Sequence, residues 1–365
     1  MLKSISLKNF KCFENLELPL KSVNVLTGVN GMGKSTVIQS LLLLRQSYRE
    51  NGLTKGLKLN GEYVRLGNGQ DILYEKAEED KFEIDIENEN GIHPYQFNYA
   101  SEDELQPIER PKTEQEIIDN SELFGNQFVY LSAYRIDSKD LYGIIDEGKL
   151  EKRELGRTGE YAFQYLSQYG AENIQNEAVI MKENDNCSLA NQVKLWMDVI
   201  SPGVMPQIKV DKQLRTSEVR YEYIEGREKT SAYRSANVGF GITYVLPIVI
   251  ALLSAQKGDL IILENPEAHI HPQGQRMLGE LIARAGSGNA QIIVETHSDH
   301  ILNGIRVVAK QKRVCAEDVS LFYFYKEDET FEHKVTIPTL YQDGRISEWP
   351  KGFFDEWENA LMELL

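Results

Sequence analysis

The eight residues GVNGMGKS at positions 28–35 constrain this chain most, because they match the pattern GxxxxGK[ST]. They follow an apolar stretch, residues 22–26, that we expect to be a strand, and they precede a leucine-rich stretch, residues 34–45, with the pattern of a helix. A glycine-rich loop between a strand and a helix directs backbone N–H groups at an anion. The motif therefore predicts a phosphate-binding loop. The alternative is an ordinary glycine turn before a helix.

The chemistry of such a loop assigns roles to its residues. We expect Lys34 to reach the β- and γ-phosphates of a nucleotide and Ser35 to offer its hydroxyl to Mg²⁺. ATP and Mg²⁺ are thus the expected ligands. The predicted phosphate-binding residues are Asn30, Gly31, Met32, Gly33, Lys34, Ser35 and Thr36.

The stretch DLIILENPE, residues 259–267, reads as an apolar strand that ends in acidic residues. Because the carboxyl ends of parallel strands face the nucleotide crevice, we expect Glu264 to hold Mg²⁺ and Glu267 to polarise the attacking water. His297 follows the next apolar stretch and is expected at the same edge, where an imidazole can donate to the γ-phosphate. The alternatives are a solvated acidic turn and a histidine packed in the core. The predicted catalytic residues are Glu264, Glu267 and His297, and the predicted metal ligands are Ser35 and Glu264.

Histidine and cysteine spacing weighs against a zinc site. Four of the six histidines, His269, His271, His297 and His300, lie in one stretch of the chain. The three cysteines are scattered and form no CxxC pair, so no familiar set of zinc ligands is present. The cysteine pattern is typical of reduced thiols in a cytosolic protein.

Charge and hydropathy exclude several classes of protein. The chain has 40 basic and 56 acidic residues, a net charge of −16, which disfavours coating nucleic acid or anionic lipid over the whole surface but leaves room for a local basic groove. The longest apolar stretch, residues 245–255, is about half of the ~20 residues that a membrane span needs. The N-terminus has no signal-peptide pattern. We therefore predict a cytoplasmic protein with no membrane partner.

Alternating strand and helix patterns after residue 238 predict an α/β fold with a parallel sheet. Earlier in the chain, residues 82–87 alternate apolar and acidic side chains, the pattern of a half-exposed strand. The secondary structure of residues 136–236 is the hardest to predict, because helical and strand-like patterns alternate there without a clear order.

Several stretches together resemble a known class of protein. Residues 5–20, 23–44, 260–275 and 292–302 are similar to the heads of ABC-type ATPases of the RecF/SMC class. Residues 260–275 and 292–302 resemble more closely the overcoming-lysogenization-defect ATPases and the related AAA ATPases of bacterial antiphage systems. Residues 343–354, DGRISEWPKGFF, resemble a C-terminal domain of unknown function found on some of these ATPases.

The resemblance implies an ABC-ATPase head, with a phosphate-loop parallel sheet, an antiparallel β lobe and a helical insert. It implies that two heads meet head to tail around ATP, so that a signature loop of one head faces the nucleotide of the other. The residues that it adds to the expected nucleotide site are Lys11, Cys12, Arg135, Asn237, Gly239 and Gly241. The expected divisions are an N-terminal ATPase lobe at 1–135, a helical insert or lid at 136–236, a C-terminal ATPase lobe at 237–326 and a strand–helix extension at 327–365.

Two departures from the family pattern bear on function. Asn265 stands where the pattern has the catalytic glutamate, and an amide cannot accept a proton as a carboxylate does. Glu267 is the expected substitute, and hydrolysis is expected to be slow. We expect the roughly forty residues after Lys326 to be too few for the Toprim nuclease domain of the overcoming-lysogenization-defect proteins.

The sequence therefore predicts an ATPase that dimerises on binding Mg-ATP and acts as a switch in antiphage defence, with a separately encoded effector nuclease as partner. One alternative is a nucleotide-gated scaffold with little turnover. The other is a DNA-repair or recombination ATPase of the RecF/SMC type, for which DNA is the partner.

Overall fold

The computed structural model of the chain divides into two compact units, each described here by itself. Unit 1 comprises residues 1–128, 320–338 and 348–365, and unit 2 comprises residues 129–319 and 339–347. The structure describes residues 1–50, 52–111, 121–135, 139, 141–181, 186–225, 228–327 and 332–364.

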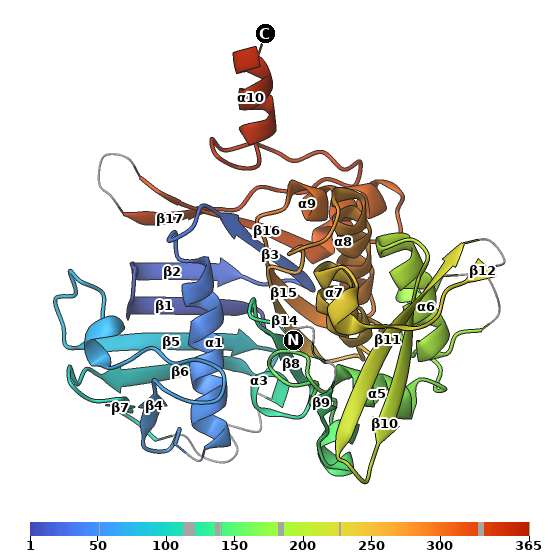
Figure 1. Cartoon of the computed structure of the whole chain (residues 1–365). Coiled ribbons are helices and arrows are strands. Elements are labelled where there is room, and N and C mark those ends of the chain that lie inside the picture. Colours follow the sequence, from blue (N-terminus) through green and yellow to red (C-terminus); the bar gives the residue numbers. More distant parts are fainter. Residues whose placement is uncertain are drawn as a thin grey trace. The chain divides into compact units, whose positions relative to one another are not determined.

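Four strands of unit 1 form an antiparallel sheet in the order β2-β1-β5-β6, drawn in blue to teal in Figure 1. Phe82, Ile84 and Ile86 of β5 are buried, as the alternation in the sequence predicts. This sheet is the expected antiparallel β lobe. The strand bounds are β1 Ser4–Phe10, β2 Phe13–Pro19, β5 Lys81–Asn88 and β6 Gly91–Asn98.

A second run of strands in unit 1 carries the glycine-rich loop. β3 lies beside β16, and β16 pairs with β17 in an antiparallel hairpin. The loop leaves the end of β3 and leads into α1, whose leucines are buried. The bounds in this part are β3 Val23–Gly28, α1 Lys34–Arg49, β4 Gly56–Lys58, η1 Gly69–Asp71, β7 Leu105–Pro107, α3 Ser121–Phe124, β16 Val319–Lys326, β17 His333–Thr336 and α10 Glu356–Leu364.

The core of unit 2 is the predicted alternation of strands and helices. β14 and β15 are parallel, with Glu264 opposite Glu295 at their carboxyl ends, and β8 borders β14. The parallel order predicted from the sequence is confirmed here. The bounds are β8 Phe128–Leu131, α7 Phe240–Leu253, β14 Leu260–Glu264, α8 Pro272–Ser287, β15 Gln291–Glu295, α9 Asp299–Lys310 and η4 Ala316–Asp318.

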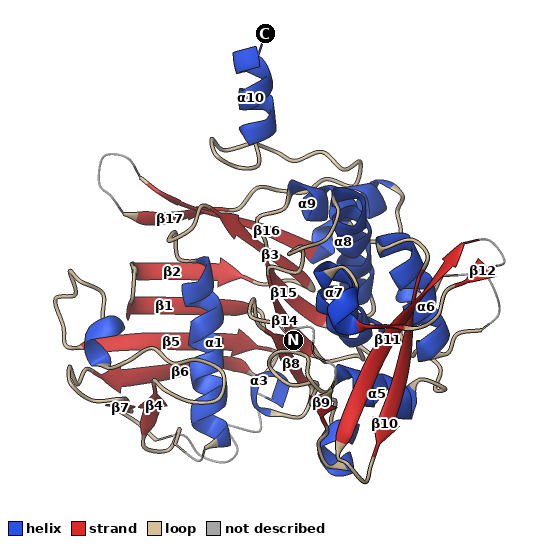
Figure 2. Cartoon of the chain, viewed as in Figure 1, coloured by secondary structure: helices blue, strands red, loops and turns tan. Residues whose placement is uncertain are grey.

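The segment expected to be a helical insert is only partly helical. Its helices α4, α5 and α6 are followed in the chain by a long antiparallel ribbon of β10 and β11, prominent in Figure 2. The β-branched and aromatic residues of β11 favour this pairing over a helix. The bounds are β9 Tyr142–Gly143, α4 Glu147–Glu151, α5 Ala162–Tyr169, η2 Glu177–Val179, α6 Leu189–Ile200, β10 Val204–Asp211, β11 Thr216–Glu225, β12 Glu228–Lys229, β13 Tyr233–Arg234 and η3 Ser235–Asn237.

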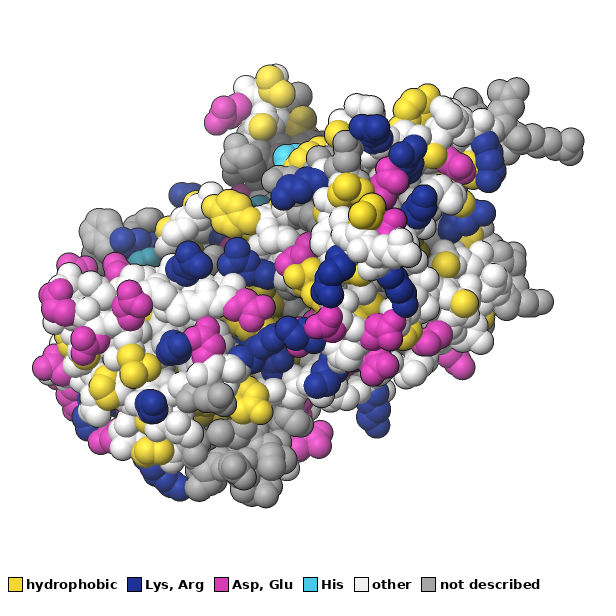
Figure 3. All heavy atoms as spheres, turned by 60° about the horizontal axis from the view of Figure 1, so that its bottom comes forward, with side chains coloured by type: hydrophobic (Ala, Val, Ile, Leu, Met, Phe, Trp, Pro, Cys, Tyr) yellow, Lys and Arg dark blue, Asp and Glu magenta, His cyan; other side chains and the backbone are white. Residues whose placement is uncertain are grey.

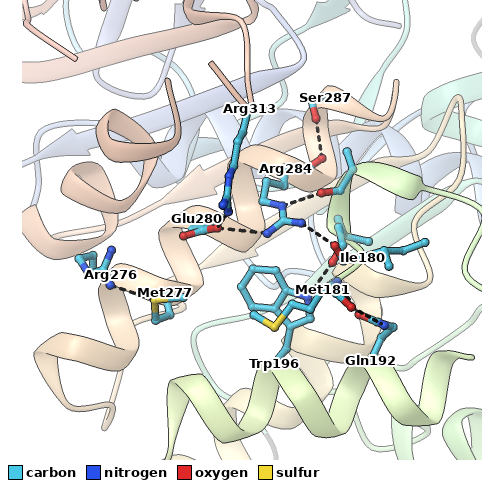
Figure 4. A network of polar contacts seen from close by, with 12 residues as sticks. Ile180, Met181, Gln192, Trp196, Arg276, Met277, Glu280, Arg284, Ser287 and Arg313 are labelled. Carbon is cyan, nitrogen blue, oxygen red and sulfur yellow. Dashed lines mark hydrogen bonds and ion pairs between the residues drawn. The ribbon is translucent and has the colours of Figure 1, made fainter. Parts of the chain in front are cut away.

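A buried polar network joins the middle of this segment, around Ala178 and Ile180, to α8 (Figure 4). Arg284 donates to the carbonyl oxygens of Ala178 (2.5 Å) and Ile180 (2.9 Å), and its guanidinium lies 5.2 Å from the Trp196 ring centroid. Glu280, one turn before it on α8, accepts from Arg284 at 3.1 Å. The arginine thus satisfies main-chain acceptors that a loop buried here would otherwise leave without partners.

Across the part of the chain that the structure describes, no helix is both long and apolar enough to cross a membrane. On the face shown in Figure 3, acidic and basic side chains lie interspersed.

Candidate functional site

The glycine-rich loop of unit 1 has the backbone that a phosphate loop requires. Gly28, Gly31 and Gly33 have φ angles of 135°, 80° and 103°, which L side chains rarely adopt. Gly33 is the N-cap of α1 and makes no side-chain capping bond, so the first N–H groups of the helix point into the loop without a side-chain cap. The loop therefore presents N–H groups and a helix N-terminus to an anion.

Lys34 places its charge inside this loop. The side chain is buried, and its Nζ donates to the carbonyl oxygens of Gly28 (2.8 Å) and Val29 (3.0 Å). Ser35 and Thr36 follow in the first turn of α1. The ammonium group and the hydroxyl groups predicted to contact a triphosphate are thus assembled on one short segment.

Lys11 and Cys12 lie beside the start of α1. Lys11 Nζ donates to Gln39 Oε1 at 2.7 Å, and Cys12 Sγ lies 3.7 Å from Thr36 Oγ1. Burial lowers the pKa of Lys11 and raises the pKa of the Cys12 thiol. Their contact with the nucleotide remains a prediction.

Glu264 ends β14 in unit 2 as a partly buried carboxylate. Its Oε2 accepts a hydrogen bond from the backbone N–H of Ala133 at 2.9 Å, and Tyr130 donates to it from β8. Burial raises the pKa of Glu264 despite these donors, and burial likewise raises the pKa of the Tyr130 hydroxyl. The ionised carboxylate is therefore held at an energetic cost that a divalent cation would offset.

Asn265 turns the chain immediately after β14. Its φ of 43° is left-handed, a region that asparagine tolerates better than most residues other than glycine. Its N–H donates to the carbonyl oxygen of Glu295 at 2.8 Å. After this reversal Glu267, and not residue 265, makes contact with the residues that follow β15.

Glu267 and His297 are brought together at the ends of neighbouring strands, as the sequence predicts. Glu267 Oε2 accepts from the Thr296 hydroxyl at 2.8 Å, and Oε1 accepts from the His297 backbone N–H at 2.8 Å. A carboxylate has about four lone-pair sites, so two remain for another donor. The side chain of His297 is at the surface.

Gln275 completes a closed ring of hydrogen bonds that also includes Glu267, Thr296 and Ser298. Ser298 Oγ donates to Gln275 Oε1 at 2.6 Å, and Gln275 Nε2 donates to the carbonyl oxygen of Glu267 at 3.4 Å. The N–H of Ser298 donates to Thr296 Oγ1 at 3.1 Å, and that hydroxyl in turn donates to Glu267. Each member of this ring is thus held by another member.

Arg135 lies behind the same turn. Its guanidinium donates to the carbonyl oxygens of Ser132 (3.0 Å), Glu264 (2.5 Å) and Asn265, and its Cζ lies 4.2 Å from the Tyr244 ring centroid. Burial lowers the pKa of Arg135 to about 10, so the group stays charged at neutral pH. The structure therefore shows Arg135 supporting the main chain of the acidic turn, and its contact with a nucleotide remains a prediction.

The expected signature residues Asn237, Gly239 and Gly241 lie just before and at the start of α7. A Cβ on Gly241 would collide with the carbonyl oxygen of His269, so close packing explains this glycine. Gly239 has a φ of −55°, and a Cβ there would meet only one side-chain atom, at 3.8 Å. Neither packing nor backbone geometry requires a glycine at 239.

The histidines of this region have packing and capping roles. His269 makes edge contacts with the rings of Phe240 and Tyr244, and His271 Nδ1 accepts from the N–H of Gln273 at the start of α8. Within the described residues, no cluster of three or more His, Cys, Asp or Glu has a metal-binding arrangement.

Sequence reasoning missed several residues of both units. Tyr130, Thr296, Gln275 and Ser298 support the acidic turn, and His333 of β17 contacts the phosphate loop. Thr296 and Ser298 flank His297, so their proximity was available from the sequence. The contacts of Tyr130 and His333 join residues far apart in the chain and left no local signal.

Comparison with known families decides the class of the chain. A model of an AAA ATPase domain matches residues 1–191, more than half of the chain. The chain belongs to this AAA ATPase family. A second AAA domain model, described with an AbiEii toxin of a type IV toxin–antitoxin system, matches residues 180–303, and a family of unknown function, DUF3696, matches residues 314–364. The last match confirms the resemblance seen at the C-terminal end of this AAA ATPase.

Individual relatives support the same class. An OLD nuclease from Thermus scotoductus is 23% identical, the match covering 90% of this chain and 65% of that protein. The endonuclease GajA from Bacillus cereus is 24% identical, over 44% of this chain and 27% of that protein. The chain thus spans less than two-thirds of the length of either relative.

Solved structures of Smc heads share the fold. A head bound to the C-winged helix domain of ScpA has a TM-score of 0.55 and 16% identity, covering 93% of this chain and 98% of that one. A head with a coiled coil and joint derived from Pyrococcus yayanosii has a TM-score of 0.55 and 11% identity, covering 99% of each chain. The fold of the predicted ABC-type head is thereby confirmed, and the AAA ATPase match and the OLD nuclease relative agree with the predicted class.

Proposed function

We propose that this chain binds Mg-ATP and hydrolyses it. The observation that carries the proposal is the phosphate loop of unit 1, in which three glycines have positive φ and the buried ammonium group of Lys34 donates to two carbonyl oxygens of the loop. A cation among N–H groups that converge on one point is the arrangement that binds a triphosphate.

The donors present fit Mg²⁺. Ser35 supplies a hydroxyl and Glu264 a carboxylate, which are hard oxygen ligands of the kind that Mg²⁺ prefers. The burial that raises the pKa of Glu264 makes an adjacent divalent cation favourable. When bound, Mg²⁺ would neutralise charge on the phosphate oxygens.

Glu267 is the proposed general base, in place of a glutamate at position 265. In hydrolysis the water oxygen bonds to the γ-phosphorus, the bond from that phosphorus to the β–γ bridging oxygen breaks, and Glu267 takes the proton of the water. The two hydrogen bonds from Thr296 and the His297 N–H fix the carboxylate while leaving lone pairs for the water. We propose that the His297 side chain contacts the γ-phosphate.

We propose further that ATP closes a head-to-tail dimer of this chain. The support is Gly239 at the start of α7, where a glycine is needed for neither packing nor backbone conformation. A glycine there leaves room for a phosphate of a second head to approach the N-terminus of α7. Asn237 and Gly241 would flank that phosphate.

A role in antiphage defence with a separately encoded effector nuclease extends this proposal. It rests on the two relatives named as nucleases, each of which aligns with this chain over part of its length. Co-purification of the ATPase with the product of a neighbouring gene would support it. A fully active ATPase with no partner under the same conditions would count against it.

DNA repair is the second candidate, because the fold is also that of Smc heads. It predicts duplex binding at physiological salt, lost on charge reversal of a local Lys/Arg groove. No retention of duplex DNA at that salt would remove this candidate.

The first test is steady-state ATP hydrolysis by the purified chain. Lys34→Ala serves as the blank, and Lys8→Ala, which removes a surface lysine paired with Glu83, serves as the matched control. Turnover above the blank, retained in Lys8→Ala, supports an ATPase. ATP binding without turnover makes the chain a nucleotide-gated scaffold, and absence of both binding and turnover contradicts the proposal.

A further inference from the structure

The hairpin of β16 and β17 packs directly against the phosphate loop within unit 1. A Cβ on Gly28, the first glycine of the loop motif, would collide with the carbonyl oxygen of Phe324 on β16. The main chain of β16 therefore occupies the space that any other residue would need at position 28. This contact fixes one end of the loop against a strand of the C-terminal segment.

The Phe13 ring forms a second contact between the loop and the hairpin. A Cβ on Gly33 would lie 2.7 Å from Phe13 Cε2, so the ring fits against the glycine at the other end of the loop. The centroid of the same ring lies 6.2 Å from the centroid of the Phe324 ring. It lies 6.1 Å from the centroid of the His333 imidazole, which it meets edge to face. The hairpin thus supports Gly33 through one shared aromatic ring.

The third contact is a direct hydrogen bond between His333 of β17 and the main chain of Gly31. This bond favours the protonated imidazole, so the ring is the donor and the Gly31 carbonyl oxygen accepts. Desolvation is the larger effect and lowers the pKa of His333, with nearby Lys326 acting in the same direction. The imidazole has at least one N–H to donate in either protonation state.

A bond to the Gly31 carbonyl has a geometric consequence inside the loop. In a trans peptide the C=O and the following N–H point in opposite directions. Holding the Gly31 carbonyl toward His333 therefore turns the N–H of Met32 away from β17. Gly31 has a φ of 80° and no atom within 4 Å of a Cβ built on it, so its own packing does not fix this peptide.

We propose that His333 positions the Gly31–Met32 peptide of the phosphate loop, so that the C-terminal segment of unknown function is a working part of the nucleotide site. The ligand class is a nucleoside triphosphate, and the inference rests on the proposed function. His333 acts through the loop and is a positioning residue. The segment at 314–364 thereby gains a role in binding affinity.

The test measures ATP affinity by equilibrium binding of a fluorescent ATP analogue to the full chain. His333→Ala is expected to weaken binding roughly 3- to 10-fold, the effect of one lost hydrogen bond. His333→Gln and His333→Asn each carry an amide N–H near one of the two ring nitrogens, and at least one is expected to restore most of the affinity. The matched control is Lys334→Ala, whose ammonium pairs with Glu332 at the surface.

The outcomes separate the two proposals. If wild type binds ATP, Lys34→Ala does not, and His333→Ala binds like wild type, the role of His333 is wrong while the ATPase proposal stands. Equal loss in His333→Ala and both amide variants, at unchanged melting temperature, also overturns the role of the N–H donor. If wild type binds no nucleotide, both proposals fail together.

Discussion

The phosphate loop of unit 1 and the acidic turn of unit 2 are held in place by different means. The loop is shaped by the main chain: three positive-φ glycines, and a lysine that donates to the carbonyl oxygens of the loop itself. The turn is shaped by side chains, because Glu267, Thr296, Ser298 and Gln275 form a closed ring of hydrogen bonds.

This difference indicates how each region is used. A loop whose polar groups are mainly backbone N–H groups gains its partners from the ligand, so changes in it should appear in ATP affinity. A turn whose carboxylate is already oriented by fixed donors is pre-organised, so changes in it should appear in the rate of the chemical step. The predictions below test this division, from the largest expected effect to the smallest.

Glu267→Gln, a change in the acidic turn, should give the largest effect, and that effect should be on kcat. The amide has the shape of the carboxylate and cannot take a proton, so kcat should fall about 10²- to 10⁴-fold while ATP binding persists. Steady-state hydrolysis and equilibrium binding measure the two quantities. Glu317→Gln, at an exposed glutamate, is the control. Unchanged turnover in Glu267→Gln would show that the base lies elsewhere.

Gly33→Ala tests the loop. An alanine must adopt a φ of 103° and would meet the Phe13 ring and Cys12 Sγ, so we expect ATP affinity to drop roughly 10- to 100-fold. Gly91→Ala is the matched control, because Gly91 has a φ of 122° and no atom within 4 Å of a Cβ built on it. A loss of kcat with unchanged affinity in Gly33→Ala would break the division between the two regions.

Gln275→Leu tests the ring that orients Glu267. Leucine removes both the acceptor for Ser298 and the donor to the turn, so kcat should fall about 5- to 20-fold with little change in KM. Gln273→Leu, at an exposed glutamine on the same helix, should leave both constants unchanged. Equal effects of the two variants would show that the ring has no role in orienting Glu267.

Glu264→Gln should separate stability from activity. The pKa of Glu264 is raised in the folded chain, so the folded state binds the proton more tightly than the unfolded state does. Wild-type stability should therefore fall as the pH rises above about 4.5 through the raised pKa. At neutral pH without Mg²⁺, we expect Glu264→Gln to melt roughly 2–4 °C above wild type and to lack ATPase activity. Thermal melts at pH 5 and pH 8 check this, and an equal pH dependence in wild type and variant would contradict it.

Local patterns were sufficient to predict much of the fold and part of the site. The motif at 28–35 lies between β3 and α1, and the acidic residues lie at the end of β14, because both signals depend on residues adjacent in sequence. The meeting of Glu267 and His297 followed from the rule that parallel strands end at one edge. Asn265 adopts a left-handed backbone conformation. Asparagine permits this conformation but also adopts others, so the residue type alone did not predict the turn.

Contacts between distant segments account for what the sequence did not reveal. The network around Arg284 joins α8 to the carbonyl oxygens of Ala178 and Ile180, more than one hundred residues earlier in the chain. No periodicity in residues 136–236 encodes such a partner. The same holds for the mixed helix and ribbon of that segment, where β11 pairs with β9, β10, β12 and β13.

Strand β16 gives the C-terminal segment a mechanical connection to the phosphate loop. Successive side chains of a strand point to opposite faces. The Tyr323 ring centroid lies 5.4 Å from that of Phe353, and the Tyr323 hydroxyl donates to the carbonyl oxygen of Lys351. The Phe324 ring packs on Phe13, and the Phe324 main chain lies against Gly28. A displacement of the residues just before α10 would therefore be carried to the loop through the Tyr323 side chain and the main chain of the next residue, Phe324.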